Sequence, residues 1–143
     1  SYIFIVNFYK YLVNQFQFSM PSEKTLINGV GIIDGNNFIY HGFSDGVEQI
    51  GCIDMERNKV VWESNLTASA LSIWFEWHEK DIYVCTEEGI INISQTGISS
   101  VVLEFADEYQ ISINEDDIVN LMVRNNEIYL MINDNIKIFS FMQ

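Results

Sequence analysis

Hydrophobic and polar positions repeat three times along this chain with similar spacing. Residues 37–40 (NFIY), 81–84 (DIYV) and 127–130 (EIYL) each begin with a polar residue and continue with three apolar ones. The runs start 44 and then 46 positions apart, and turn-forming residues precede and follow each of them. Short apolar runs between turns are typical of β-strands, so the pattern predicts three similar units built from short antiparallel strands.

The expected architecture is all-β and antiparallel. The strand pattern places the units at residues 26–66, 70–106 and 116–143, within a single domain of residues 1–143. A repeat of this length, made of turn-separated strands, is typical of β-propeller blades. A closed propeller has about four to eight blades. Three units therefore predict an open or wrapped sheet, or two copies that together close a ring.

The first 21 residues form a strongly apolar and aromatic segment. It is too short, and too often interrupted by polar residues, for a membrane span. It also lacks the basic start and the small-residue cleavage site of a secretion signal. Its spacing fits both a helix and a strand. We expect this segment to pack on the sheet and cover an exposed edge.

The first unit contains a motif that permits a family comparison. Cys52, Asp54, Lys59 and Trp62 resemble the tryptophan-docking motif of pyrroloquinoline-quinone-type propeller blades, and more loosely WD40-like blades. Asn58 stands where that motif has Gly, and Asn accepts the left-handed backbone that the turn requires. The resemblance implies a blade fold. Independently of the family, we expect Asp54, at the start of a turn, to cap its amides, and the flat Trp62 to pack between neighbouring sheets. It implies no quinone or calcium site here.

The charge of the chain limits the classes of partner that it can bind. The net charge is −13 and the pI is about 4.2, while 48% of residues are hydrophobic, which excludes a disordered chain. Residues 81–123 contain nine acidic residues and no Lys or Arg. Such a chain repels nucleic acids and anionic membranes and attracts cationic partners.

Catalytic and metal-binding motifs are missing from the sequence. The two histidines, His41 and His78, have no Ser, Cys or second His at motif spacing. Cys52 and Cys85 lie in apolar runs and are expected to be buried thiols in a reducing compartment. We therefore expect no enzyme activity, no cofactor and no metal.

One acidic cluster is the candidate binding site. It lies between the second and third units, where carboxylates surround aromatic and aliphatic residues. Its alternative interpretation is a solvated loop, with a short helix at residues 107–109. The candidate partner-binding residues are Glu104, Asp107, Glu108, Tyr109, Glu115, Asp116 and Asp117.

Two classes of function fit these features. The chain resembles, in physical type, the small acidic immunity proteins of bacteria that neutralise toxins, including those of contact-dependent growth inhibition. This class implies a cytoplasmic inhibitor, monomeric or weakly dimeric, that covers the active site of a basic toxin, typically a nuclease. The alternative is a propeller-repeat scaffold that assembles with itself or forms part of a larger propeller.

Overall fold

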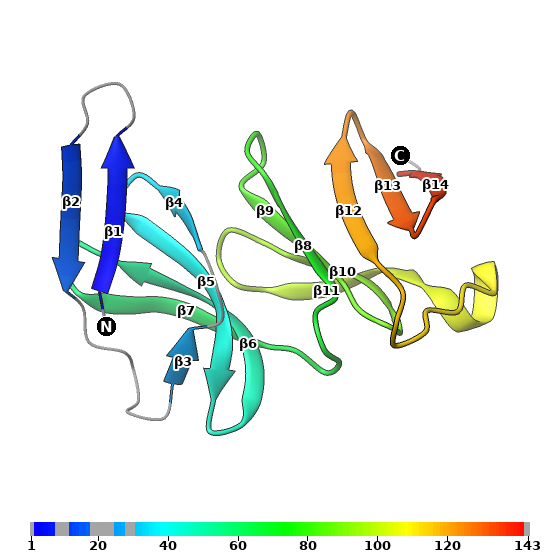
Figure 1. Ribbon diagram of the computed structural model, residues 1–143, viewed down its shortest axis with the longest axis horizontal. Coiled ribbons are helices and arrows are strands. Elements are labelled where there is room, and N and C mark those ends of the chain that lie inside the picture. Colours follow the sequence, from blue (N-terminus) through cyan, green and yellow to red (C-terminus); the bar gives the residue numbers. More distant parts are fainter. Residues whose placement is uncertain (1, 8–11, 18–24, 28–30, 142–143) are drawn as a thin grey trace. The chain divides into compact units, whose positions relative to one another are not determined.

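The structure of the protein is a computed structural model (Figure 1). It describes the backbone of residues 2–7, 12–17, 25–27 and 31–141, and side chains within residues 31–141 except 107 and 108. The chain forms two compact units, residues 1–65 and 66–143.

The first unit contains an N-terminal hairpin and a larger antiparallel sheet. The hairpin pairs β1 with β2, and the sheet has the order β3-β5-β6-β7, with β4 also paired to β5. Because β3 and β4 pair with opposite ends of β5, they share one of its sides. The strands are β1 (Tyr2–Asn7), β2 (Leu12–Gln17), β3 (Thr25–Ile27), β4 (Ile32–Asp34), β5 (Asn37–Ser44), β6 (Val47–Asp54) and β7 (Lys59–Asn65).

Two turns of this sheet follow from their residue types. Asp45 and Gly46 connect β5 to β6, both with positive φ, as a two-residue turn matched to strand twist requires. Between β6 and β7, the Asp54 carboxylate accepts hydrogen bonds from the amides of Glu56 and Arg57, both at 3.0 Å. Asn58 closes that turn in the left-handed region, with a φ of 53°. The predicted cap and the predicted left-handed residue are both confirmed.

The second unit contains two antiparallel sheets, which Figure 1 shows as separate groups of strands. Their orders are β11-β10-β9-β8 and β12-β13-β14, so in both sheets strands adjacent in sequence are paired. A short π-helical turn, Phe105–Tyr109, follows the first sheet. The strands are β8 (Ser72–Glu76), β9 (Asp81–Cys85), β10 (Gly89–Ile93), β11 (Ser99–Glu104), β12 (Val119–Arg124), β13 (Glu127–Ile132) and β14 (Asn135–Ser140).

The three repeated runs occupy equivalent places in the three larger sheets. Each run opens an inner strand (β5, β9 or β13), and its second and fourth residues are buried while its third is half-buried. This alternation is what a strand with one core-facing side produces. The first and third copies also share a hydrogen bond at the same place, because Met55 N donates to Asn36 O and Phe141 N donates to Asn126 O, both at 2.8 Å.

The core of the second unit lies between its two sheets. Cys85, Ile90 and Leu103 from the first sheet pack with Leu121 and Leu130 from the second. The Ser72 hydroxyl on β8 also accepts a hydrogen bond from Leu121 N at 3.0 Å. The smaller core of the first unit is built around Phe38, Tyr40 and Ile53.

The all-β, antiparallel prediction is confirmed. In the described residues there is no α-helix, and each sheet is open, with an edge strand on each side. The strand interpretation of the N-terminal segment is correct at β1 and β2. The predicted packing of its aromatic side chains lies outside the described residues. The short helix considered at residues 107–109 falls within the π-helical turn.

Candidate functional site: a pocket with two carboxylates

The site begins at the turn between β9 and β10. Thr86 is buried, and its hydroxyl accepts a hydrogen bond from Glu88 N at 3.2 Å and donates one to Gly89 O at 3.3 Å. The Thr86 amide also donates to Gly89 O, at 2.8 Å. These bonds fix a tight turn, so the position of Glu88 is set by the side chain two residues before it.

The neighbouring strand approaches this turn closely. Gly89 pairs with Glu104, and Phe105 N donates to Glu88 O at 3.0 Å. A Cβ on Gly89 would lie 2.0 Å from Leu103 O, so only glycine permits this approach. The register between β10 and β11 then shifts, because Ile90 pairs with Leu103 whereas Ile91 pairs with Val101. Such a β-bulge redirects side chains locally.

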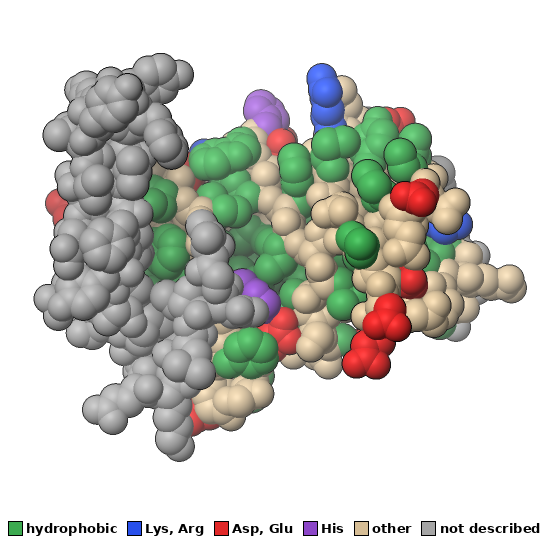
Figure 2. Space-filling view, in the orientation of Figure 1, with side chains coloured by type: hydrophobic (Ala, Val, Ile, Leu, Met, Phe, Trp, Pro, Cys, Tyr) green, Lys and Arg blue, Asp and Glu red, His purple; other side chains and the backbone are tan. Residues whose placement is uncertain are grey.

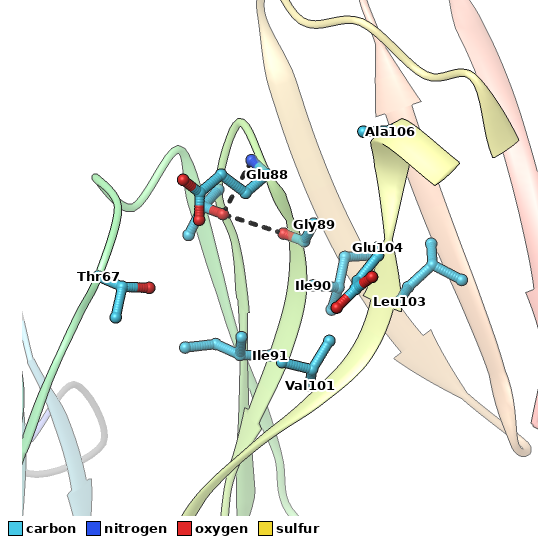
Figure 3. Close-up of a pocket in the computed structure, with 10 residues that line it drawn as sticks. Thr67, Glu88, Gly89, Ile90, Ile91, Val101, Leu103, Glu104 and Ala106 are labelled. Atoms are coloured by element: carbon cyan, nitrogen blue, oxygen red, sulfur yellow. Dashed lines mark hydrogen bonds between the residues drawn. The ribbon is translucent and has the colours of Figure 1, made fainter. Parts of the chain in front are cut away.

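These features shape a pocket of about 250 Å³, which lies entirely on the second unit. Figure 3 shows Glu88 on the β9–β10 turn and Glu104 at the end of β11, with Ile91 and Val101 beside each other on the paired strands. Val101 is 62% exposed although it is aliphatic. The lining residues are Thr67, Thr86, Glu88, Gly89, Ile90, Ile91, Val101, Leu103, Glu104 and Ala106.

The charge at the pocket is uncompensated within the described part of the chain. Glu88 and Glu104 are exposed, and no cationic side chain there forms an ion pair with either carboxylate. The surrounding sequence, residues 81–123, also contains no Lys or Arg. Two carboxylates beside aliphatic side chains create a negative potential next to an apolar surface. Figure 2 shows acidic and hydrophobic side chains interspersed on the visible surface.

The predicted partner-binding residues lie in different local environments. Glu104 lines the pocket. Tyr109 is 39% exposed and packs edge-on against Phe139 of β14, with ring centroids 5.0 Å apart. Glu115 and Asp116 are exposed in a turn. The side chains of Asp107 and Glu108 lie outside the described residues.

Asp117 has a structural role. Its carboxylate accepts hydrogen bonds from Asn114 N and from the Asn133 side chain, both at 2.8 Å. The Asn114 amide, followed by the Asn133 amide group, holds the pKa of Asp117 below its usual value. Asp117 therefore joins the 114–117 turn to the β13–β14 turn, and within the described residues it shares neither a hydrogen bond nor a pocket with Glu104.

The sequence did not single out Glu88 as a candidate. It is 16 positions from Glu104, and only the pairing of β10 with β11 brings the two residues to one pocket. The available signal was the Glu87-Glu88-Gly89 turn followed by an apolar strand. The pairing of β10 with β11 could have been inferred from the hairpin pattern.

The other candidate groups have ordinary surroundings. His41 Nε2 lies 2.6 Å from Glu48 Oε1 across β5 and β6, and His78 is exposed beside Glu79. Both cysteines are buried and unpaired by disulfide, as expected, and burial raises the pKa of Cys85 to about 12. Over the described residues, no three His, Cys, Asp or Glu side chains are grouped as a metal site would require. No helix there has the length and apolar character needed to cross a membrane.

The chain was compared with protein families, curated proteins and solved structures. No protein-family model, curated protein or solved structure matches this chain.

Proposed function

We propose that this protein is an acidic binding protein that captures and neutralises a cationic protein. The observation that carries the proposal is the continuous acidic stretch of residues 81–123, which has nine carboxylates and no cation and presents two of them at one pocket. A negative surface accelerates encounter with a basic partner, and apolar groups beside it then slow dissociation. The chain acts by steric occlusion and is not an enzyme.

The partner we propose is a basic toxin, with a nuclease as the specific class. A nuclease holds phosphates with Lys and Arg, so its active-site surface is cationic. A protein with a net charge of −13 is complementary to that surface and repels the nucleic acid substrate. We place the protein in the bacterial cytoplasm as an immunity protein, of the kind that protects against contact-dependent growth inhibition.

An affinity capture followed by an activity assay tests this function. The tagged protein is incubated with an extract of its source cell, and captured proteins are identified by mass spectrometry. We expect a basic nuclease that loses its activity on RNA or DNA when one equivalent of this chain is added. Captured proteins that are acidic, or a nuclease that stays active in the complex, would contradict the proposal.

A second function is favoured by the repeated sheets. Each of the three larger sheets contains a run of sequential antiparallel strands around an equivalent inner strand, which supports a blade-like origin. The sheet β12–β14 also carries exposed Met122, Met131, Ile136 and Ile138. The alternative is therefore a propeller-repeat scaffold that assembles with copies of itself. Solution mass separates the two, because a dimer without partner favours the scaffold and a monomer that binds one toxin favours the inhibitor.

A further inference from the structure

We infer that the pocket between the β9–β10 turn and β11 is a subsite for one long cationic side chain, a Lys or Arg of the bound protein. The inference deepens the proposed function and rests on it for the identity of the partner as a basic protein. It adds the place on this chain where a single side chain of that partner is inserted.

The size of the pocket favours a side chain over a free metabolite or cofactor. Its volume is about 250 Å³. Pockets that enclose small-molecule ligands and cofactors measure about 300–1,000 Å³. The cavity lies just below the lower end of this range, which favours a small group, and it is open at the surface, where a side chain from another protein can enter.

The lining has two chemically different parts. Ile91, Val101 and Leu103 provide aliphatic surface, and Glu88 and Glu104 provide carboxylates. Lys and Arg side chains have the same two parts. Their aliphatic stem packs on apolar surface, while the charged head stays near water and anions. A carboxylate accepts short, charge-assisted hydrogen bonds from an ammonium or a guanidinium group.

Other ligand classes fit the pocket less well. An anion would meet two carboxylates, and an uncharged apolar group would use only the aliphatic part of the lining. The described residues contain no group of three His, Cys, Asp or Glu side chains that could hold a metal ion. A cation with an aliphatic stem uses both parts of the lining.

The rigidity of the pocket supports recognition of an inserted group. The Thr86 bonds to Glu88 and Gly89 fix the turn, and the close approach of Gly89 to Leu103 fixes the adjoining strands. A pre-organised site loses little entropy when it binds. Thr86 and Gly89 are therefore positioning residues, whereas Glu88 and Glu104 contact the cation.

Nuclear magnetic resonance titration of the full chain with small probes tests the subsite without the partner. The probes are the N-acetyl amides of lysine and arginine, with N-acetyl-norleucine amide as an uncharged analogue of similar length. We expect the cationic probes to shift the amide signals of Glu88, Gly89, Ile91, Val101 and Glu104 in a saturable way. The norleucine probe should bind at least about tenfold more weakly, a difference of about 1.4 kcal/mol.

Variants identify which groups are responsible. Glu88→Gln and Glu104→Gln keep the shape of each side chain and remove its charge, so each should weaken cationic-probe binding about tenfold. Glu87→Gln removes an exposed charge from the same turn outside the pocket lining and serves as the matched control, with little change expected. Folding of each variant is checked by its amide spectrum.

The outcomes separate this inference from the proposed function. Equal binding of norleucine and lysine probes, absence of shifts at the pocket, or Gln variants that bind like the wild type would overturn the subsite. If any of these occurs while the chain still captures and inhibits a basic nuclease, the function stands and the subsite is wrong. If the probes bind as expected and the captured partner is not basic, the subsite stands and the function is wrong.

Discussion

The buried thiol of Cys85 shows how a single residue couples this fold to pH. Cys85 is fully buried in the core between the two sheets of the second unit. Burial raises its pKa from 9.0 to about 12, because the thiolate loses hydration there. Burial, followed by the nearby Asp54 and Asp34 carboxylates, raises the pKa of Cys52 to about 11. Both thiols therefore keep their protons in the folded state when the unfolded chain has lost them.

The expected consequence is a loss of stability in base. Above about pH 9 the folded state binds more protons than the unfolded state, so the free energy of unfolding falls as pH rises towards 12. Below pH 9 this contribution is fully present. Urea denaturation at several pH values should show a shallower decline for Cys85→Ala than for the wild type. Cys52→Ala removes the smaller Cys52 contribution and keeps that of Cys85, so its decline should lie between those of the wild type and Cys85→Ala. A slope in Cys85→Ala equal to that of the wild type would contradict the assignment.

Local residue roles were predictable where they depend on neighbours in sequence. The cap by Asp54 and the left-handed Asn58 were both predicted, since a turn of this length requires them. Glu88 was not predicted, because its role depends on a strand 16 positions away. Asp117 stays a predicted partner-binding residue, and the structure adds that its carboxylate accepts hydrogen bonds from Asn114 and Asn133. Exposure and internal hydrogen bonds cannot be read from charge alone.

At the scale of elements, the hairpin β10–β11 decides the shape of the candidate site. The repeat pattern predicted short antiparallel strands within residues 70–106, and β10 and β11 lie there. The bulge at Val102 and the close approach at Gly89 could not be predicted, because they arise from how two strands meet. The same limit applies to the packing of the β8–β11 sheet on the β12–β14 sheet.

The variant Gly89→Ala tests this hairpin. The added methyl group would overlap Leu103 O, so the backbone must shift. We expect a loss of about 1–3 kcal/mol in the free energy of unfolding, as for overpacked interiors. Cationic-probe binding should also weaken, since the pocket walls move. Ser100→Ala, at an exposed position of β11, is the control and should change stability by less than about 0.5 kcal/mol. A Gly89→Ala protein as stable as the control would show that the strands do not approach so closely.

At the scale of the whole molecule, charge is distributed unevenly. Residues 81–123 carry a net charge of −9 out of −13, whereas residues 124–143 are neutral. Exposed charges act over about 10 Å at 0.1 M salt, so a stretch without cations creates a local field even when the entire chain is acidic. We therefore propose that the acidic stretch, rather than net charge alone, captures a cationic partner.

A titration with a lysine octapeptide, followed by fluorescence anisotropy, tests that claim directly. One variant reverses Glu104, Glu115 and Asp116 to Lys and leaves Asp117 intact because of its hydrogen bonds. A matched variant reverses Glu63, Glu79 and Asp134, three exposed carboxylates outside residues 81–123, and changes the net charge equally. At low salt we predict that the first variant binds the peptide at least about tenfold more weakly than the second. Equal weakening in both variants would contradict the account, because binding would then follow net charge alone.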